Sequence, residues 1–244
     1  AAGGRAAVEV RRPLRVAVFS TGDEVAEPPD DLKPGAVYDS NRYTLMAGLR
    51  GLHCAVSDLG ILPDDRGKIR DALAGAGRQH DLILTSGGVS TGDEDHVRAA
   101  VEAIGSLHFW RLAIKPGRPV AMGQVGRTPL VGLPGNPGAV LVTFLLIARP
   151  IVLLLAGADA PPPRRYPVRA GFEHRKKEGR REFVRARLCR SADGTLTAVK
   201  HGRSGAGILS SLVNADGLVD LPPDLTYLES GQTVDFLPFS EVMT

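Results

Sequence analysis

The stretch DLILTSGGVSTG, residues 81–92, gives the strongest indication of the fold. Asp81–Thr85 is an apolar run of the kind found in the middle of a parallel sheet, where both faces are covered. Ser86–Gly92 is a loop rich in glycine and hydroxyl groups, and a helix is expected over about residues 95–104. Glycine lets a backbone approach a ligand, hydroxyls donate hydrogen bonds, and a helix N-terminus is partially positive, so this loop suits an oxyanion. A tight strand-to-helix turn without a ligand would have a similar composition.

Strand and helix patterns alternate on both sides of this stretch. Strands are predicted over residues 15–20, 53–62 and 129–133, with a strand pair over 107–114 and 119–123, and helices over 39–52, 66–77 and the apolar run that ends near 157. Asp39, Ser40 and Asn41 are candidate caps for the first of these helices. Such alternation predicts a layered α/β domain with a parallel sheet over residues 15–157, preceded by an entry segment over 1–14.

The composition changes after residue 157. Three consecutive prolines stiffen a linker over residues 158–165, and helical periodicity disappears beyond it. The remaining sequence, residues 166–244, predicts short strands separated by Gly, Asp-Gly and Pro-Pro turns, most simply a small all-β barrel. The strands are expected at 166–170, 182–188, 196–200, 217–221 and 233–237.

Charge and composition limit the class of function. The net charge is +3 and aromatic residues make up only 5% of the chain, without a basic tract interleaved with aromatics, so we expect no nucleic acid partner. Two cysteines far apart argue for a reducing compartment, and the cytoplasm is the default location. The apolar run Ala139–Leu155 is interrupted by Thr143, Arg149 and Pro150, which predicts a buried helix and no membrane span. The N-terminus lacks signal-peptide organisation.

A second loop, Pro134-Gly135-Asn136-Pro137-Gly138, also lies between a strand and a helix. Alone it is a weak signal, because Gly and Pro there also shape an ordinary turn. The carboxyl ends of parallel strands meet at one edge of a sheet, where ligands bind. The two loops are therefore predicted to lie at the same edge of the sheet, which favours ligand binding by both.

Acidic residues follow three of the predicted strands. Asp23 and Glu24 follow the first, Asp64 and Asp65 the second, and residues 93–95 (Asp-Glu-Asp) the third. Carboxylates that converge on one cleft suit a hydrated Mg²⁺, which takes one or two carboxylates together with ligand phosphates. The alternative is that they are helix caps and solvated charges, and Asp95 in particular occupies an N-cap position.

Lys115-Pro116-Gly117-Arg118-Pro119 places two cations in a rigid turn beside the same edge, as a phosphate-plus-metal site requires, although a surface turn with solvated charges is an equal alternative. The six histidines show no metal-ligand spacing. Neither a Gly-x-Ser-x-Gly elbow nor a Walker loop occurs, and Cys54 lies in a predicted apolar strand. The chemistry is thus expected to depend on positioning and a metal ion.

Five motifs, in this order, resemble those of the molybdopterin molybdenumtransferase family, which includes MoeA and the gephyrin E-domain. They are FSTGDE (19–24), YDSN (38–41), TSGGVSTGDEDHV (85–97), AIKPGRP (113–119) and GLPGNP (132–137). The later segments GRREFVRARL (179–188) and RSGAGILSSLVNADGL (203–218) resemble the family's C-terminal domain. The resemblance covers nearly the whole chain and implies a three-layer α/β/α molybdopterin-binding domain followed by the β barrel.

The resemblance also implies an activity: Mg²⁺-dependent insertion of molybdate into adenylylated molybdopterin, with release of AMP. Carried onto matching positions, Glu24, Asp64 and Asp95 serve the metal and molybdate, and Lys115 joins them as a catalytic residue. The substrate-binding positions that it implies are Thr21, Gly22, Asp23, Ser86, Gly87, Gly88, Val89, Ser90, Gly92, Arg118, Pro134, Gly135, Asn136, Pro137, Arg185 and Ser204.

The sequence departs from the family pattern at two points. Arg118 stands where members often carry Lys, which keeps the charge but changes the hydrogen-bond geometry. The family's N-terminal portion, which builds much of its homodimer, is missing, so the chain is expected to be a fragment or a short form. The resemblance implies a homodimer through the full-length parent and contact with the adenylyltransferase of the same pathway. Two alternatives remain open: a molybdopterin adenylyltransferase, which shares the α/β fold and the glycine-rich loop, and a pterin-binding scaffold without turnover.

Overall fold

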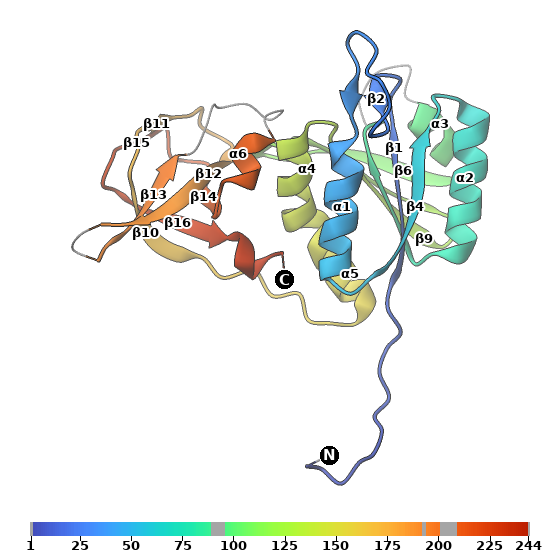
Figure 1. Ribbon diagram of the computed structural model, residues 1–244, viewed down its shortest axis with the longest axis horizontal. Coiled ribbons are helices and arrows are strands. Elements are labelled where there is room, and N and C mark those ends of the chain that lie inside the picture. Colours follow the sequence, from blue (N-terminus) through green and yellow to red (C-terminus); the bar gives the residue numbers. More distant parts are fainter. Residues whose placement is uncertain (1, 89–95, 192–193, 201–208, 244) are drawn as a thin grey trace.

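The computed structural model describes residues 2–88, 96–191, 194–200 and 209–243, and consists of an α/β part and a β barrel (Figure 1). The sheet of the α/β part has the strand order β4-β1-β5-β9-β8-β6. Its first four strands are parallel, and β8 pairs antiparallel with both β9 and β6. The sheet is therefore mixed, because the predicted strand pair forms an antiparallel hairpin at one side. The bounds are β1 Arg15–Thr21, β4 Ala55–Leu62, β5 Leu82–Ser86, β6 Gly105–Arg111, β8 Pro119–Val125 and β9 Thr128–Leu133.

Helices cover both faces of this sheet. Successive side chains of a strand point to opposite faces, and in β1 Val16 and Val18 belong to one hydrophobic cluster while Ala17 and Phe19 belong to another. The first cluster includes Leu45 of α1 and the second includes Ile69 of α2. The predicted three-layer α/β/α arrangement is therefore confirmed. The helices are α1 Ser40–Gly51, α2 Arg66–Gln79, α3 His96–Glu102, α4 Pro137–Thr143 and α5 Arg149–Ala156, with a π-helical segment η1 over Phe144–Ala148.

The helical stretch Pro137–Ala156 is long and apolar enough to cross a membrane by length and composition, and half of its apolar window is buried inside the protein. The helices of soluble cores pass the same test. Val140, Phe144 and Val152 lie in the main hydrophobic cluster, beside β1 and α1, which supports its interpretation as a core helix. The π-helical segment stands just before Pro150, whose missing N–H disturbs regular α-helical pairing.

The C-terminal part is a closed barrel of five strands, in the order β13-β10-β16-β14-β12, with β12 pairing back to β13. The predicted barrel is confirmed. Short additional elements, which the pattern did not predict, are the pair β11–β15, helix α6 and the 3-10 helix η2. The bounds are β10 Tyr166–Ala170, β11 His174–Arg175, β12 Arg181–Arg190, β13 Leu196–Lys200, α6 Ser210–Val213, β14 Gly217–Leu221, β15 Tyr227–Leu228, β16 Thr233–Pro238 and η2 Phe239–Glu241.

The two parts are joined by more than the linker. Strand β7 (Ile114–Lys115), from the α/β part, pairs in parallel with β12 of the barrel. Phe183, Leu218 and Leu237 of the barrel also belong to the hydrophobic cluster that contains Val140 and Leu141 of α4. The sequence pattern treats the parts as separate, but one strand pairing and one continuous core hold them together.

Candidate functional site

The carboxyl edge of the sheet, where β1, β4, β5 and β9 end, brings the two predicted loops together. Ser86 pairs in register with Leu133. The Ser86 hydroxyl donates to the Pro134 carbonyl at 3.2 Å, and the Gly87 amide donates to the Leu133 carbonyl at 3.3 Å. From α1, the Asn41 side-chain amide donates to the Gly135 carbonyl at 2.6 Å. Three segments far apart in sequence thus meet at one edge.

Two cavities flank the Gly135–Asn136 segment, which lines both. The first, the edge cavity, has a volume of about 480 Å³ and lies at the carboxyl edge. The second, the interdomain cavity, has a volume of about 400 Å³ and lies between the α/β part and the barrel. The edge cavity is lined by Ser20, Thr21, Glu24, Val25, Val37, Tyr38, Asp39, Ser40, Asn41, Ser86, Gly87, Gly135, Asn136, Pro137 and Leu209.

Buried hydroxyl groups at the end of β1 line the edge cavity. Ser20 is 2% exposed and Thr21 is 4% exposed, and within the described part of the chain neither side-chain oxygen has a hydrogen-bond partner. The Asn41 carbonyl oxygen, Oδ1, is likewise buried and unpartnered there. Because buried polar groups are normally hydrogen-bonded, such a cluster in a cavity wall indicates that a polar ligand completes it.

The start of the glycine-rich loop requires glycine. Gly87 has φ +85°, and a Cβ there would lie 2.6 Å from the Thr21 carbonyl oxygen. Gly88 has φ +60°, and its Cβ would lie 2.5 Å from the Thr21 hydroxyl. No other residue fits without moving the backbone. The rest of the loop lies outside the described residues, and with it the predicted positions Val89, Ser90, Gly92 and Asp95.

The predicted carboxylates are placed differently from one another. Glu24 lines the edge cavity, and its carboxylate lies over Gly22, whose Cβ would come within 2.7 Å of Glu24 Oε2. Asp23 is exposed. Asp64 is also exposed, two residues after Leu62, which pairs with Thr21. The described residues contain no group of three or more acidic, histidine or cysteine side chains placed to hold a metal ion. Glu24 is thus the predicted carboxylate in this cavity wall.

Asp65 behaves as a helix cap. Its carboxylate is the N-cap of α2 and accepts from the Lys68 amide at 2.9 Å. That hydrogen bond lowers the pKa of Asp65, because it favours the charged form. The capping alternative considered for the acidic residues is therefore correct at this position.

Asp39 lines the edge cavity. The sequence indicated it only as a candidate helix cap, so this position in the site was missed. It is indeed the N-cap of α1, accepting from the Arg42 amide at 3.0 Å, and its other carboxylate oxygen accepts from Arg42 Nε at 3.0 Å. The buried Arg42 also pairs with Asp58 of β4 and with Glu27. Burial lowers the pKa of Arg42, but the hydrogen bonds to these three carboxylates outweigh it and raise the pKa.

A small flap forms one wall of the edge cavity. Its two strands, β2 (Val25–Ala26) and β3 (Val37–Tyr38), pair in parallel and stand above the start of α1 (Figure 1). Val25, Val37 and Tyr38 line the cavity, and Glu27, next to β2, accepts hydrogen bonds from Arg42 and from the Tyr43 hydroxyl. The Arg42 network therefore ties the flap to α1 and keeps this wall in place.

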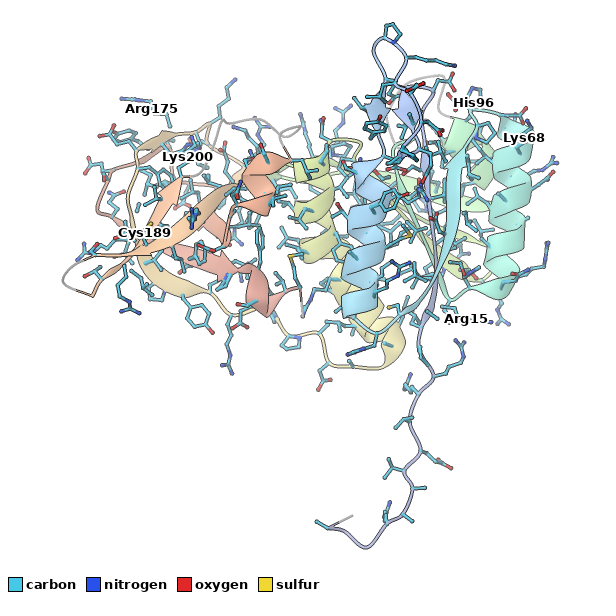
Figure 2. The ribbon with its side chains drawn as sticks, in the orientation of Figure 1. Arg15, Lys68, His96, Arg175, Cys189 and Lys200 are labelled. Carbon is cyan, nitrogen blue, oxygen red and sulfur yellow. The ribbon has the colours of Figure 1, made fainter. Side chains whose placement is uncertain are left out.

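The interdomain cavity collects cations from both parts of the protein. Lys115 ends β7 and Arg118 lies in the turn before β8, whereas Arg185 and Lys200 come from the barrel, where Lys200 ends β13 (Figure 2). Burial lowers the pKa of Arg185, as expected for a cation withdrawn from water. The predicted Ser204 lies outside the described residues. The lining comprises Lys115, Pro116, Gly117, Arg118, Pro119, Pro134, Gly135, Asn136, Gly138, Ala139, Val142, His174, Glu182, Phe183, Val184, Arg185 and Lys200.

One carboxylate lies among these cations. Glu182 of β12 is 5% exposed, and Lys115 Nζ donates to both of its oxygens, at 3.2 and 3.3 Å. His174 Nε2 lies 2.9 Å from Glu182 Oε2. Neither Glu182 nor His174 was singled out from the sequence, because only the β7–β12 pairing, in which Glu182 is the register partner of Lys115, brings them to the loop.

The predicted residues thus divide between two cavities. Thr21, Glu24, Ser86, Gly87 and Pro137 line the edge cavity, and Lys115, Arg118, Pro134 and Arg185 the interdomain cavity, while Gly135 and Asn136 line both. The linings as described do not include Gly22, Asp23, Asp64 and Gly88.

Cys54 shows no sign of nucleophilic reactivity. It lies just before β4, not within it, and burial raises the pKa of its thiol to about 11. A thiol with such a pKa stays protonated near neutral pH, and only the thiolate is a strong nucleophile. Cys54 is therefore not a candidate nucleophile.

Family models match both parts of the chain. Residues 17–153 match a model described as a probable molybdopterin binding domain, and residues 167–239 match the MoeA C-terminal region, domain IV. The first match spans the α/β part, including both loops. The second spans most of the barrel.

Relatives match over nearly the whole chain. The chain is 36% identical over 241 residues to the molybdopterin molybdenumtransferase of Haemophilus influenzae, covering 98% of this chain and 60% of that protein. It is 35% identical to molybdopterin molybdenumtransferase 2 of Mycobacterium tuberculosis, covering 95% of this chain and 58% of the relative. The crystal structure of the molybdopterin biosynthesis MoeA protein from Pyrococcus horikosii matches with a TM-score of 0.78 and 29% identity, over 93% of this chain and 55% of that one. The chain thus spans about 60% of the length of these relatives.

Proposed function

Since the chain belongs to the MoeA family, with a molybdopterin-binding domain followed by the MoeA C-terminal region, we propose that it acts as a molybdopterin molybdenumtransferase in molybdenum cofactor biosynthesis. The reaction is the insertion of molybdate into adenylylated molybdopterin, with release of AMP. The observation that carries the proposal is the pair of cavities that meet at Gly135–Asn136: one is lined by hydroxyls that have no hydrogen-bond partner among the described residues, and the other by cations.

The edge cavity is the site for the phosphorylated pterin. The buried Ser20 and Thr21 hydroxyls and the backbone at Gly87 offer hydrogen-bonding groups at the end of a rigid sheet. Donors fixed in place before the ligand binds need no reorganisation when negative charge develops, which is the condition for electrostatic catalysis. A volume of about 480 Å³ lies within the usual range for small-molecule sites.

The interdomain cavity is the site for molybdate. Lys115, Arg118, Arg185 and Lys200 line it, and a dianionic oxyanion would offset the positive charge that they concentrate. Because Gly135 and Asn136 also line the edge cavity, an oxyanion held here would lie next to the pterin site. The protein then works mainly by holding two reactants close together, which lowers the entropic part of the barrier.

Mg²⁺ fits the donor set of the edge cavity. Glu24 supplies a carboxylate to its wall, and Mg²⁺ in proteins usually takes one or two carboxylates together with substrate phosphates and water. Glu24 would hold the ion, with Asp64 and Asp95 as the further predicted carboxylates. When bound, the ion neutralises charge on the phosphate oxygens. The residues of the chain hold and orient the phosphate that leaves with AMP.

The proposal extends to the setting in which the protein works. We expect the full gene product to form a homodimer. Because adenylylated molybdopterin is the substrate, we also expect it to contact the adenylyltransferase of the same pathway. A cytoplasmic location agrees with Cys54 and Cys189, both free thiols.

The test supplies the full gene product with adenylylated molybdopterin and Mg²⁺, with and without molybdate, and measures AMP and bound molybdenum. Molybdate should trigger consumption of the substrate, with AMP and molybdenum cofactor formed together. AMP release without molybdenum uptake would contradict the proposal. Consumption of ATP with free molybdopterin would instead indicate an adenylyltransferase, and pterin binding without turnover would indicate a scaffold.

A further inference from the structure

Glu182 is an unusual residue for the wall of an oxyanion site. Its side chain is 6% exposed, and it places a negative charge among the cations of the interdomain cavity. A carboxylate in that position repels an oxyanion, and it is costly to bury unless it is paired. A carboxylate at this position therefore needs a function that offsets both its cost of burial and its repulsion of the ligand.

The contacts of Glu182 indicate such a role. Both of its oxygens accept from Lys115 Nζ, at 3.2 and 3.3 Å, and Oε2 also lies 2.9 Å from His174 Nε2. Burial raises the pKa of Glu182, but the hydrogen bonds from His174 and Lys115 lower it further than burial raises it, so the charged form is kept. The carboxylate is fixed in the wall, with the lysine on one side and the imidazole on the other.

Among the described residues, Lys115 makes no side-chain hydrogen bond or ion pair other than those to Glu182. Its side chain is 56% exposed, and it lies on a strand of two residues. A lysine side chain has four rotatable bonds and loses considerable rotamer entropy when a ligand orders it. An ammonium group has three donors, so it can keep its contact with Glu182 and still donate to an oxyanion.

We propose that Glu182 is a positioning residue for the oxyanion site: it holds Lys115 Nζ at the wall of the interdomain cavity before the ligand arrives, and His174 holds Glu182. The proposal rests on the proposed function, in which this cavity binds molybdate. It makes the C-terminal part a participant in the site, since Glu182 lies on barrel strand β12 and His174 on the additional strand β11, whereas Lys115 belongs to the α/β part. The β7–β12 pairing sets the register of this contact.

Two effects oppose each other when Glu182 becomes neutral. Glu182→Gln removes a negative charge, which by itself would tighten the binding of an anion. It also frees the Lys115 side chain. Ordering this side chain when molybdate binds then reduces the binding free energy. If positioning dominates, the dissociation constant for molybdate rises, by about three- to tenfold for one side chain that the ligand must immobilise.

The experiment measures molybdate binding by isothermal titration calorimetry to the wild type, Glu182→Gln, Lys115→Met and the double variant. We expect Glu182→Gln to weaken binding in the wild-type background and to have little effect once Lys115 is Met, because its role is exercised through Lys115. Equal or tighter binding by Glu182→Gln, or the same loss in both backgrounds, would overturn the proposal. A merely structural role would give that equal loss.

Matched controls complete the design. Glu178→Gln removes the same charge from an exposed position four residues away and should leave the dissociation constant unchanged. If Glu182→Gln does not fold, Glu182→Asp keeps the charge but shortens the reach to Lys115, and weaker binding is again expected. Failure of the proposed function looks different: the wild type and Lys115→Met would then bind molybdate equally, or neither would bind it.

Discussion

The two cavities are built in opposite ways, although one segment, Gly135–Asn136, lines both. Apart from Leu209, the lining of the edge cavity comes from the α/β part, and it relies on hydroxyls, backbone groups and glycines at the ends of buried strands. The charged residues that line the interdomain cavity come from two parts of the protein and have long side chains with many rotatable bonds. The edge cavity is rigid because it lies on a rigid sheet. The side chains of the interdomain cavity must be held in place by contacts such as the one between Glu182 and Lys115.

This difference predicts that substitutions will separate the two binding functions. Changes at the sheet edge should impair pterin binding and leave molybdate binding intact, and changes between the domains should do the reverse. Stability should also respond strongly at the sheet edge, where the Arg42–Asp39 ion pair and the Ser20 and Thr21 hydroxyls are buried.

The largest effect is expected at Arg42. Replacing it by Met leaves Asp39 buried without its cation, and breaking a buried ion pair on one side costs about 3–5 kcal/mol. Arg42→Met should therefore lower the free energy of unfolding by that amount in chemical denaturation, and it should weaken pterin binding through the released flap. Arg70→Met, which removes an exposed arginine paired with Asp71, is the control and should stay within about 0.5 kcal/mol of the wild type. A loss at Arg42 no larger than at Arg70 would show that the network does not stabilise the edge cavity.

The next effect is expected at Gly87. Gly87→Ala combines a positive φ with a Cβ that would lie 2.6 Å from the Thr21 carbonyl oxygen, so the loop must shift, at a cost of about 3 kcal/mol. We expect pterin binding to be lost and molybdate binding to persist, as measured by titration with each ligand. Gly126→Ala is a matched control, since Gly126 also has positive φ but a Cβ there meets nothing within 4 Å. If both ligands are lost together, the two cavities are not independent sites.

A smaller effect is expected at Arg185, and it should fall on molybdate binding and not on pterin binding. Arg185→Met removes a charged donor from the interdomain cavity, and hydrogen bonds to charged groups contribute about 2 kcal/mol, or roughly thirtyfold in the dissociation constant. Molybdate binding should weaken by that factor, with pterin binding little changed. Arg187→Met, two residues along the same strand and exposed, should change neither. Equal weakening of both ligands by Arg185→Met would instead place the two ligands in one shared pocket.

The same difference explains how much the sequence could predict. The motifs of the edge cavity lie at the ends of strands, so the apolar runs and the parallel order were enough to place Ser86 and Gly135 at one edge, whereas Thr21 was assigned to the site only by the family resemblance. Strands and the loops at their ends can be predicted in this way because the spacing of apolar residues and the residues next to them in the sequence determine them.

The residues that sequence reasoning missed depend on contacts between distant segments. Arg42 resembles an ordinary exposed helix residue until β4 and the flap bring Asp58 and Glu27 to it. Glu182, which also contacts His174, reaches Lys115 only because β7, a strand of two residues, pairs with the barrel. Nothing in the pattern around Ile114–Lys115 distinguishes this strand from a turn, so the interdomain cavity had to be seen in three dimensions.

The smallest effect, at Ser20, makes the sharpest distinction between folding and function. The Ser20 hydroxyl is buried without a hydrogen-bond partner in the described chain, so Ser20→Ala removes a group that is unfavourable in the empty protein. The variant should unfold at equal or higher denaturant concentration, with a gain of up to about 1 kcal/mol, while pterin binding weakens by about tenfold. Thr143→Val is the contrasting control, because it removes a buried hydroxyl that already donates to the Ala139 carbonyl at 2.7 Å and faces no ligand in this proposal, so it should lower stability and leave pterin binding unchanged. A Ser20→Ala protein that loses stability and keeps its affinity would mean that the hydroxyl serves the fold, and that the edge cavity recognises its ligand through the backbone alone.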